Sequence, residues 1–148
     1  MRLSLTLLLS LHVFMALAQT PAKDNWEILA AVKFVPKHFK KADQYFLVPE
    51  FDEKIKKFEN KRFVLKGHFI PIDMSSERML IISRVPFAAC FFCGGAGPES
   101  VVEVHLRAIP SRRFKTDQML EVNGTLVLND KDIEHMSFML KDAFIVTK

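Results

Sequence analysis

Apolar and polar residues alternate along three stretches in the second half of the chain. These stretches, residues 102–108, 120–128 and 136–146, each place their apolar side chains on one face, at the two-residue period of a half-buried β-strand. In the third stretch Asp142 falls on the same face as Leu140 and Phe144, so a β-bulge or a strand end is expected there. The pattern therefore predicts three strands in this half.

The first half of the chain has a more varied pattern. Residues 62–73 alternate, with a bend expected at Gly67, and residues 79–85 are nearly all apolar, as in a central strand. Residues 26–35 fit the periods of both a strand and a helix, and we favour a strand. Residues 51–59 are predicted to form a helix because apolar residues recur there at helical spacing, at Phe51, Ile55 and Phe58.

Five or six short strands with one short helix indicate a mainly β protein built as a small closed or nearly closed β-barrel. Closure would remove the exposed sheet edges that promote aggregation. A β-sandwich is the alternative. No repeat, low-complexity tract or long linker interrupts the pattern, so one domain is expected.

The N-terminus has the features of an export signal. Arg2 precedes an apolar run at residues 3–17, and the triplet at residues 16–18 fits the small-x-small rule for signal-peptidase cleavage before Gln19. The run is shorter than the roughly 20 apolar residues that a membrane-spanning helix needs. We therefore predict a signal peptide at residues 1–18 and a mature domain at residues 19–148. That domain is expected to be soluble, periplasmic or secreted, and without a transmembrane segment.

The charge of the chain is mild. The formal net charge is +4, and it falls by one when Arg2 leaves with the signal peptide. Basic residues gather at residues 54–62 and 107–115, which we interpret as a solvated surface. Nucleic acid is not expected as a partner, because the charge is small and an exported protein seldom meets nucleic acid.

One segment, residues 90–100, has chemical rather than architectural character. It contains Cys90 and Cys93, the only cysteines of the chain, in a C-x-x-C arrangement. In an exported protein this pair indicates a local disulfide or two partly buried thiols. The alternative is half of a metal site, because soft thiolates suit Zn²⁺ or Cu⁺. Histidines or a second subunit would have to complete it, and we name His105 first, because its strand directly follows the segment; His68 and His135 are the other candidates.

A redox enzyme and a contact loop are two further interpretations of this segment. Thiol-disulfide exchange usually places C-x-x-C at a helix N-terminus, and the sequence Gly-Gly-Ala-Gly-Pro that follows Cys93 does not readily open a helix, so a redox enzyme is disfavoured. No G-x-S-x-G or H-E-x-x-H motif points to another enzyme. The segment could instead form a contact loop, through its two aromatic residues and its glycines, Phe91, Phe92, Gly94, Gly95 and Gly97.

The order of several motifs resembles small exported bacterial proteins of unknown function. The motifs are the Trp-Glu-Ile-Leu of residues 26–29, the run at residues 61–72, and the Gly-Pro-Glu-Ser of residues 97–100 with the strand after it. The resemblance implies an OB-like barrel. Because some of those proteins occur with ABC-class transport systems connected with metal uptake, it also implies an envelope protein or transport component as partner, and metal handling.

Two functional hypotheses follow. The first is an exported, non-catalytic binding or accessory module that uses residues 90–100 as its contact site. The second is a zinc- or copper-binding protein associated with envelope transport, with Cys90, Cys93 and His105 as ligands. The sequence identifies neither the ligand nor the partner.

Overall fold

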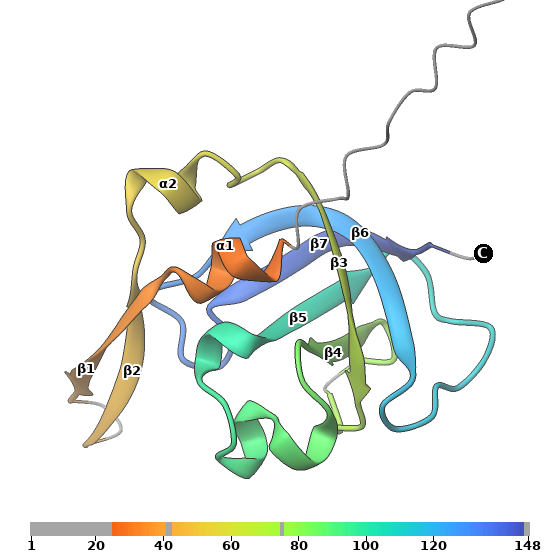
Figure 1. The fold of residues 1–148 in the computed structure, drawn as a ribbon, viewed down its shortest axis with the longest axis horizontal. Coiled ribbons are helices and arrows are strands. Elements are labelled where there is room, and N and C mark those ends of the chain that lie inside the picture. Colours follow the sequence, from red (N-terminus) through yellow and green to blue (C-terminus); the bar gives the residue numbers. More distant parts are fainter. Residues whose placement is uncertain (1–24, 41–42, 75, 147–148) are drawn as a thin grey trace, which may run out of the picture.

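A closed five-stranded barrel forms the body of the molecule (Figure 1). The computed structural model describes residues 25–40, 43–74 and 76–146. The strands of the barrel follow one another in the order β3-β4-β5-β7-β6, and β6 closes the barrel against β3. Their bounds are β3 Arg62–Ile70, β4 Met79–Ser83, β5 Val101–Leu106, β6 Met119–Leu128 and β7 Phe138–Ile145.

The pairing of these strands is antiparallel except between β5 and β7, which run parallel. A parallel pair requires a long crossover connection, and here β6 and the segments around it supply that connection. The structure confirms the predicted fold class, a mainly β protein with a small OB-like barrel and little helix.

The N-terminal part lies outside the barrel, as the orange and gold segments of Figure 1 show. It consists of helix α1 (Trp26–Ala30), an antiparallel hairpin of β1 (Lys33–Phe39) and β2 (Gln44–Glu50), and helix α2 (Glu53–Lys56). The predicted helix is confirmed but is shorter than residues 51–59. It begins after Asp52, whose carboxylate accepts hydrogen bonds from the backbone N–H groups of Lys54 at 2.9 Å and Ile55 at 3.1 Å.

The strand that we favoured for residues 26–35 is wrong over its first half. Trp26 and Leu29 are both buried against the barrel, and a spacing of three residues puts them on one face only in a helix. The indole Nε1–H of Trp26 also donates a 2.8 Å hydrogen bond to the backbone oxygen of Lys66. Packing on β3 therefore favours the helix over the strand at residues 26–30, where the sequence pattern fits both.

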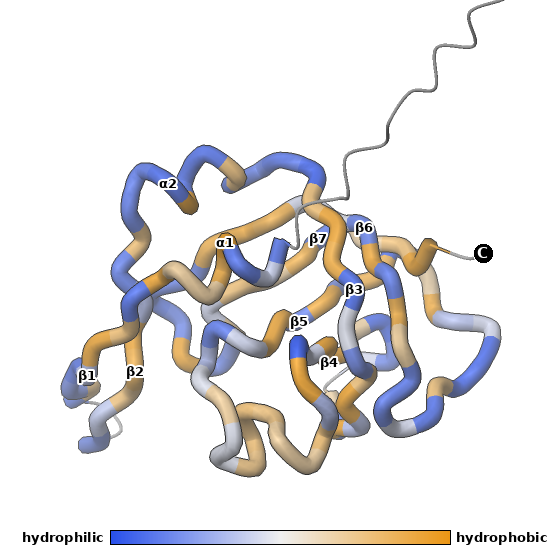
Figure 2. Tube along the Cα trace, viewed as in Figure 1, coloured by the Kyte–Doolittle hydropathy of each residue, from blue (hydrophilic) through white to orange (hydrophobic). Residues whose placement is uncertain are grey.

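The barrel has apolar residues on two sides of β3, β4 and β5. The main core fills the interior and includes Leu65, Ile82, Val102 and Leu140. A second cluster lies on the outer face of these strands and contains Ile70, Ile81, Cys90 and Val101. The segment between β4 and β5, largely orange to white in Figure 2, covers this outer face with three short 3₁₀ helices, η1 (Phe87–Ala89), η2 (Phe91–Cys93) and η3 (Pro98–Ser100).

The predicted irregularity at Asp142 is a β-bulge. The register between β6 and β7 shifts there, and Asp142 has a positive φ of 50°. Because of the extra residue, Ala143 turns into the core, while Phe144 lies outside with 40% of its surface exposed. The expectation that Phe144 faces inward is therefore wrong. The guanidinium groups of Arg62 and Arg107 lie over its ring, 5.4 and 5.5 Å from the centroid.

Residues 1–24 lie outside the described residues. The predicted signal peptide, its cleavage site and the first residues of the mature domain fall in this part and stay predictions. Within the described part of the chain, no helix is long and apolar enough to cross a membrane.

We expect Gly67→Ala to lower the free energy of unfolding by about 1–3 kcal/mol, the usual cost of overpacking. A Cβ at Gly67 would lie 2.7 Å from the backbone oxygen of Ser83 and 3.0 Å from the Trp26 ring, and the backbone cannot move away cheaply. Urea unfolding followed by circular dichroism measures the change. Lys66→Ala, at an exposed neighbouring position, is the control, and equal stability of the two variants would contradict the prediction.

Candidate functional site

Glu103 is a buried carboxylate on the outer face of the barrel. Its neighbours Val102 and Val104 on β5 point into the core, so Glu103 and His105 point outward, as the alternation predicted for His105. Glu103 is nevertheless only 1% exposed. A carboxyl group removed from water in this way requires hydrogen-bond or charged partners. β5 itself and the segment between β6 and β7 supply them.

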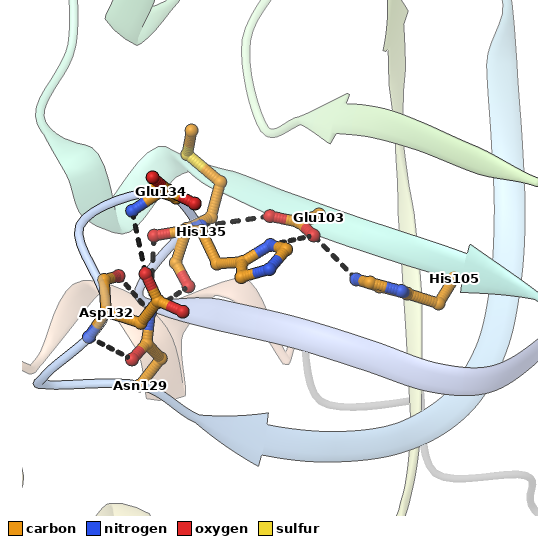
Figure 3. Close-up of polar contacts among 7 residues, drawn as sticks. Glu103, His105, Asn129, Asp132, Glu134 and His135 are labelled. Carbon is orange, nitrogen blue, oxygen red and sulfur yellow. Dashed lines mark hydrogen bonds and ion pairs between the residues drawn. The ribbon is translucent and has the colours of Figure 1, made fainter. Parts of the chain in front are cut away.

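Three groups converge on this carboxylate (Figure 3). His105 Nε2 lies 2.6 Å and His135 Nδ1 lies 2.8 Å from the same oxygen, Glu103 Oε1. The other oxygen, Oε2, accepts a 3.0 Å hydrogen bond from the backbone N–H of Met136. One oxygen therefore meets two imidazoles from opposite sides, while the backbone holds the other oxygen in place.

The loop that carries His135 is folded around the side chain of Asn129. Asn129 Nδ2 donates to the backbone oxygens of Asp132 at 2.6 Å, His135 at 3.2 Å and Met136 at 3.3 Å. Its Oδ1 accepts from the N–H of Asp132 at 3.0 Å, and Asp132 in turn accepts from the N–H of Glu134 at 3.0 Å. These bonds fix the backbone on both sides of His135, so the point from which its side chain projects is set before any ligand arrives.

The cluster has the donors of a metal centre. Glu103, His105 and His135 each offer one ligand atom, and these atoms lie within 4.8 Å of one another. Two imidazoles and one carboxylate are a common ligand set for Zn²⁺ and related divalent ions. At metal–ligand distances of about 2.0–2.2 Å, tetrahedral ligand atoms lie roughly 3.3 Å apart. Each nitrogen, now 2.6 or 2.8 Å from Glu103 Oε1, would therefore move away from that oxygen by a fraction of an ångström, and all three atoms already lie within 4.8 Å of one another.

The two histidines have the freedom to make this adjustment. Their side chains are 28% and 38% exposed, whereas Glu103 is enclosed and held by Met136. Metal binding would replace the imidazole protons that now point at Glu103 Oε1. Without a metal, the same three side chains form a satisfied hydrogen-bond cluster.

A cavity of about 420 Å³ adjoins the cluster on the side of His135. It lies between β2, the segment at residues 129–137 and the loop at residues 91–98. Its walls are mostly apolar, and His135 belongs to both the cavity and the cluster. The lining includes Phe46, Val48, Phe91, Pro98 and Ile133.

The two cysteines lie elsewhere. Cys90 is buried in the outer apolar cluster, Cys93 is exposed, and both are thiols in the structure. The backbone oxygen of Cys90 accepts hydrogen bonds from the N–H groups of Cys93 at 3.0 Å and Gly95 at 3.2 Å, which close the turn. A Cys90–Cys93 disulfide stays a prediction.

The structure does not assemble the predicted ligand set of Cys90, Cys93 and His105. The ligand-atom group that contains His105 contains Glu103 and His135 instead of the thiols. The reason is the length of β5, because the cysteine segment enters at its N-terminal end and His105 lies near its C-terminal end. Five residues of strand separate Ser100 from His105, which is about 16 Å.

The glycines of the predicted contact loop are required by the local backbone conformation and by close contacts within the loop. Gly94 adopts a left-handed φ of 74° at the end of η2, and a Cβ on Gly95 would meet the backbone oxygen of Ala89 at 2.6 Å. A Cβ on Gly97 would collide with the carboxylate of Glu99. Phe92 is 40% exposed, whereas Phe91 is partly buried and lines the cavity.

Sequence reasoning named two of the three cluster residues and overlooked the central one. His105 and His135 were both considered, but as partners of the cysteines. Glu103 was assigned only to the polar face of its strand. The signal available was its position two residues before His105, which places both side chains on one face. The position of His135, 32 residues further on, requires the tertiary structure.

Comparison of the chain with protein-family models, with curated proteins and with solved structures found no match. The resemblance to small exported bacterial proteins therefore stays a prediction. The geometry and chemistry of the cluster and its cavity are the basis for assigning a function.

We expect Cys93 to be a poor nucleophile. Desolvation by the surrounding loop and then the neighbouring Cys90 thiol raise the pKa of Cys93 above its ordinary value. The alkylation rate by iodoacetamide, followed by peptide mass spectrometry, should therefore reach its midpoint at a higher pH than for an ordinary cysteine. In Cys90→Ser the midpoint should move down, because the Cys90 contribution is lost. A midpoint below the ordinary value would support a redox role instead.

We expect Asn129→Ala to loosen the loop that carries His135, with a loss of about 1–3 kcal/mol in the free energy of unfolding. The backbone groups that Asn129 satisfies would lose their partner. Hydrogen exchange of the amides at residues 131–136 should accelerate. Asn129→Asp keeps the accepting oxygen but has no N–H groups for the carbonyls, so it should accelerate exchange less than alanine. Unchanged exchange in both variants would refute the positioning role.

Proposed function

We propose that this chain is an exported binding module, without catalytic activity of its own, that holds a divalent transition-metal ion between Glu103, His105 and His135. The observation that supports it most strongly is the convergence of two imidazole nitrogens on one oxygen of a carboxylate that is only 1% exposed. Zn²⁺ is the best match, because it accepts mixed nitrogen and oxygen ligands at tetrahedral spacing.

The surroundings of the carboxylate favour a cation. Placing a metal ion beside Glu103 would set a positive charge against a carboxyl group that is shielded from water, where the attraction is stronger than at the surface. The hydrogen bond from Met136 orients the ligating carboxylate, which is the role that outer-shell partners have in known metal sites. Loop order imposed by Asn129 lowers the entropy that His135 has to lose on binding.

The nitrogen and oxygen donors of the cluster support a metal site without the thiols of Cys90 and Cys93. Copper(I) prefers soft sulfur ligands, and nitrogen and oxygen donors suit Zn²⁺ better than Cu⁺. The raised pKa of Cys93 also opposes formation of the thiolate that a metal would need. The cysteine segment is therefore proposed to contribute through Phe91 and Pro98, which form one wall of the cavity beside the cluster.

The predicted export signal and this cluster together support a role in the cell envelope. A periplasmic or secreted metal-binding module would deliver its ion to, or receive it from, an envelope protein or a transport component. This partner is proposed on the resemblance described above, and the metal site is proposed independently of it.

We expect the mature, metal-free protein to bind one Zn²⁺ per chain, measured by isothermal titration calorimetry. Glu103→Gln and His135→Ala each remove a ligand and should weaken binding by at least about tenfold. Co²⁺ should give a visible absorption spectrum in the wild type that these variants lose. Glu103→Gln preserves the size of the side chain, which separates loss of a ligand from loss of packing.

Two control variants complete this experiment. His68→Ala removes a histidine on β3 that lies beside Asp117 and outside the cluster, and Cys93→Ser removes the exposed thiol. Both should bind Zn²⁺ as the wild type does. If Cys93→Ser abolishes binding while His135→Ala retains it, the thiol-based site is correct and the proposed centre is wrong. No binding in the wild type would reject both.

A further inference from the structure

The cavity beside the metal centre has the properties of a small-molecule site. Its volume of about 420 Å³ falls within the usual range for ligand pockets, about 300–1,000 Å³. Aromatic side chains from two separate parts of the chain line it, Phe46 from β2 and Phe91 from η2. Polar groups come from the segment at residues 129–137, where Asn129 is already occupied with its own loop, and from Tyr45 of β2.

His135 connects this cavity to the cluster. Its Nδ1 faces Glu103, its side chain is 38% exposed, and the same residue lines the cavity. Its neighbour Met136 also lines the cavity while donating its N–H to Glu103. A metal ion held by Glu103, His105 and His135 would therefore share one ligand, His135, with the wall of the cavity.

Three protein ligands do not complete the coordination of such an ion. Zinc sites with three protein ligands keep a fourth position for water or another ligand. Glu103 and the strand β5 occupy the side of the barrel, so the remaining position lies away from β5. Both histidine side chains are partly exposed, so a ligand from outside reaches part of each ring.

We propose that the metal centre and the cavity together bind one small molecule that has an oxygen-donor head and an apolar, preferably aromatic, body. The head completes the coordination of the ion, and the body lies between the walls formed by Phe46 and Phe91. The inference rests on the proposed metal centre and adds the chemical class of its ligand.

The choice of an apolar body follows from the composition of the walls. Among the described residues that line the cavity, Lys131 is the lysine, and Asp130 and Asp132 are the acidic residues that accompany it. A highly charged body would thus meet side chains of both positive and negative charge at residues 130–132 and apolar side chains elsewhere in the cavity. A neutral aromatic body replaces water at the apolar walls and loses no strong hydrogen bond.

Three probes separate the contributions of head and body. Benzohydroxamate has a bidentate oxygen head and an aromatic ring, acetohydroxamate has the same head with a methyl group, and benzamide has the ring with a much weaker metal-binding group. Each is titrated into the Zn²⁺-loaded full-length mature protein by calorimetry and into the Co²⁺-loaded protein by visible spectroscopy. We expect benzohydroxamate to bind at least tenfold more tightly than acetohydroxamate, and benzamide to leave the Co²⁺ spectrum unchanged.

A matched pair of variants tests the wall. Phe91→Ala opens the cavity and should remove the preference for benzohydroxamate, while Zn²⁺ affinity stays at the wild-type value. Phe92→Ala changes the adjacent aromatic residue, which is exposed and does not line the cavity, and should keep the preference. Ile133→Glu, at an exposed lining position on the segment between β6 and β7, provides a second test if Phe91→Ala fails to fold.

The outcomes distinguish the two proposals. If the protein binds no metal, the proposed function fails. If it binds metal but both hydroxamates bind with equal affinity, the metal centre stands and the aromatic-body inference is overturned. Equal binding of benzohydroxamate to the metal-free protein would also overturn it, because the head would then make no contact with the ion.

Discussion

Burial of the Glu103 carboxyl group is the constraint around which the outer side of the barrel is organised. Such a group is costly to remove from water unless donors replace the lost hydration. His105, His135 and the backbone of Met136 supply those donors from two elements that are distant in sequence. The need to satisfy one side chain thus ties the segment between β6 and β7 to the outer face of β5.

The topology makes this attachment possible. Because β5 and β7 are parallel neighbours, the segment that enters β7 lies close to the beginning of β5, where the cysteine segment also arrives. Two long connections therefore meet over one strand, and the hairpin β1–β2 forms the third side of the space between them. The order of strands in the barrel determines where the hydrogen-bond donors to Glu103 lie. The segments between β4 and β5 and between β6 and β7 determine what surrounds them.

Much of the fold could be predicted from periodicity, and the site could be predicted only in part. Alternation located β5, β6 and β7 because each has one face in the core, and it located the bulge because Asp142 interrupts that face. The short helix α1 was misassigned because its apolar run fits two periods until Trp26 packs on β3. In the sequence Glu103 resembled a surface residue. The loop that covers it begins at Asn129, 26 residues later, and no residue near Glu103 in the sequence indicates that contact.

The bulge at Asp142 has a consequence for the solubility of the barrel surface. It turns the large ring of Phe144 outward. Left uncovered, this ring would be an exposed apolar patch on the strand. Arg62 and Arg107 both lie over that ring, and the Asp142 carboxylate pairs with Arg107 at 2.6 and 2.7 Å, which lowers the pKa of Asp142. The bulge thus exposes Phe144 and also places Asp142 where it pairs with an arginine that covers the ring. Part of the positive charge near residue 107 is therefore neutralised within the chain.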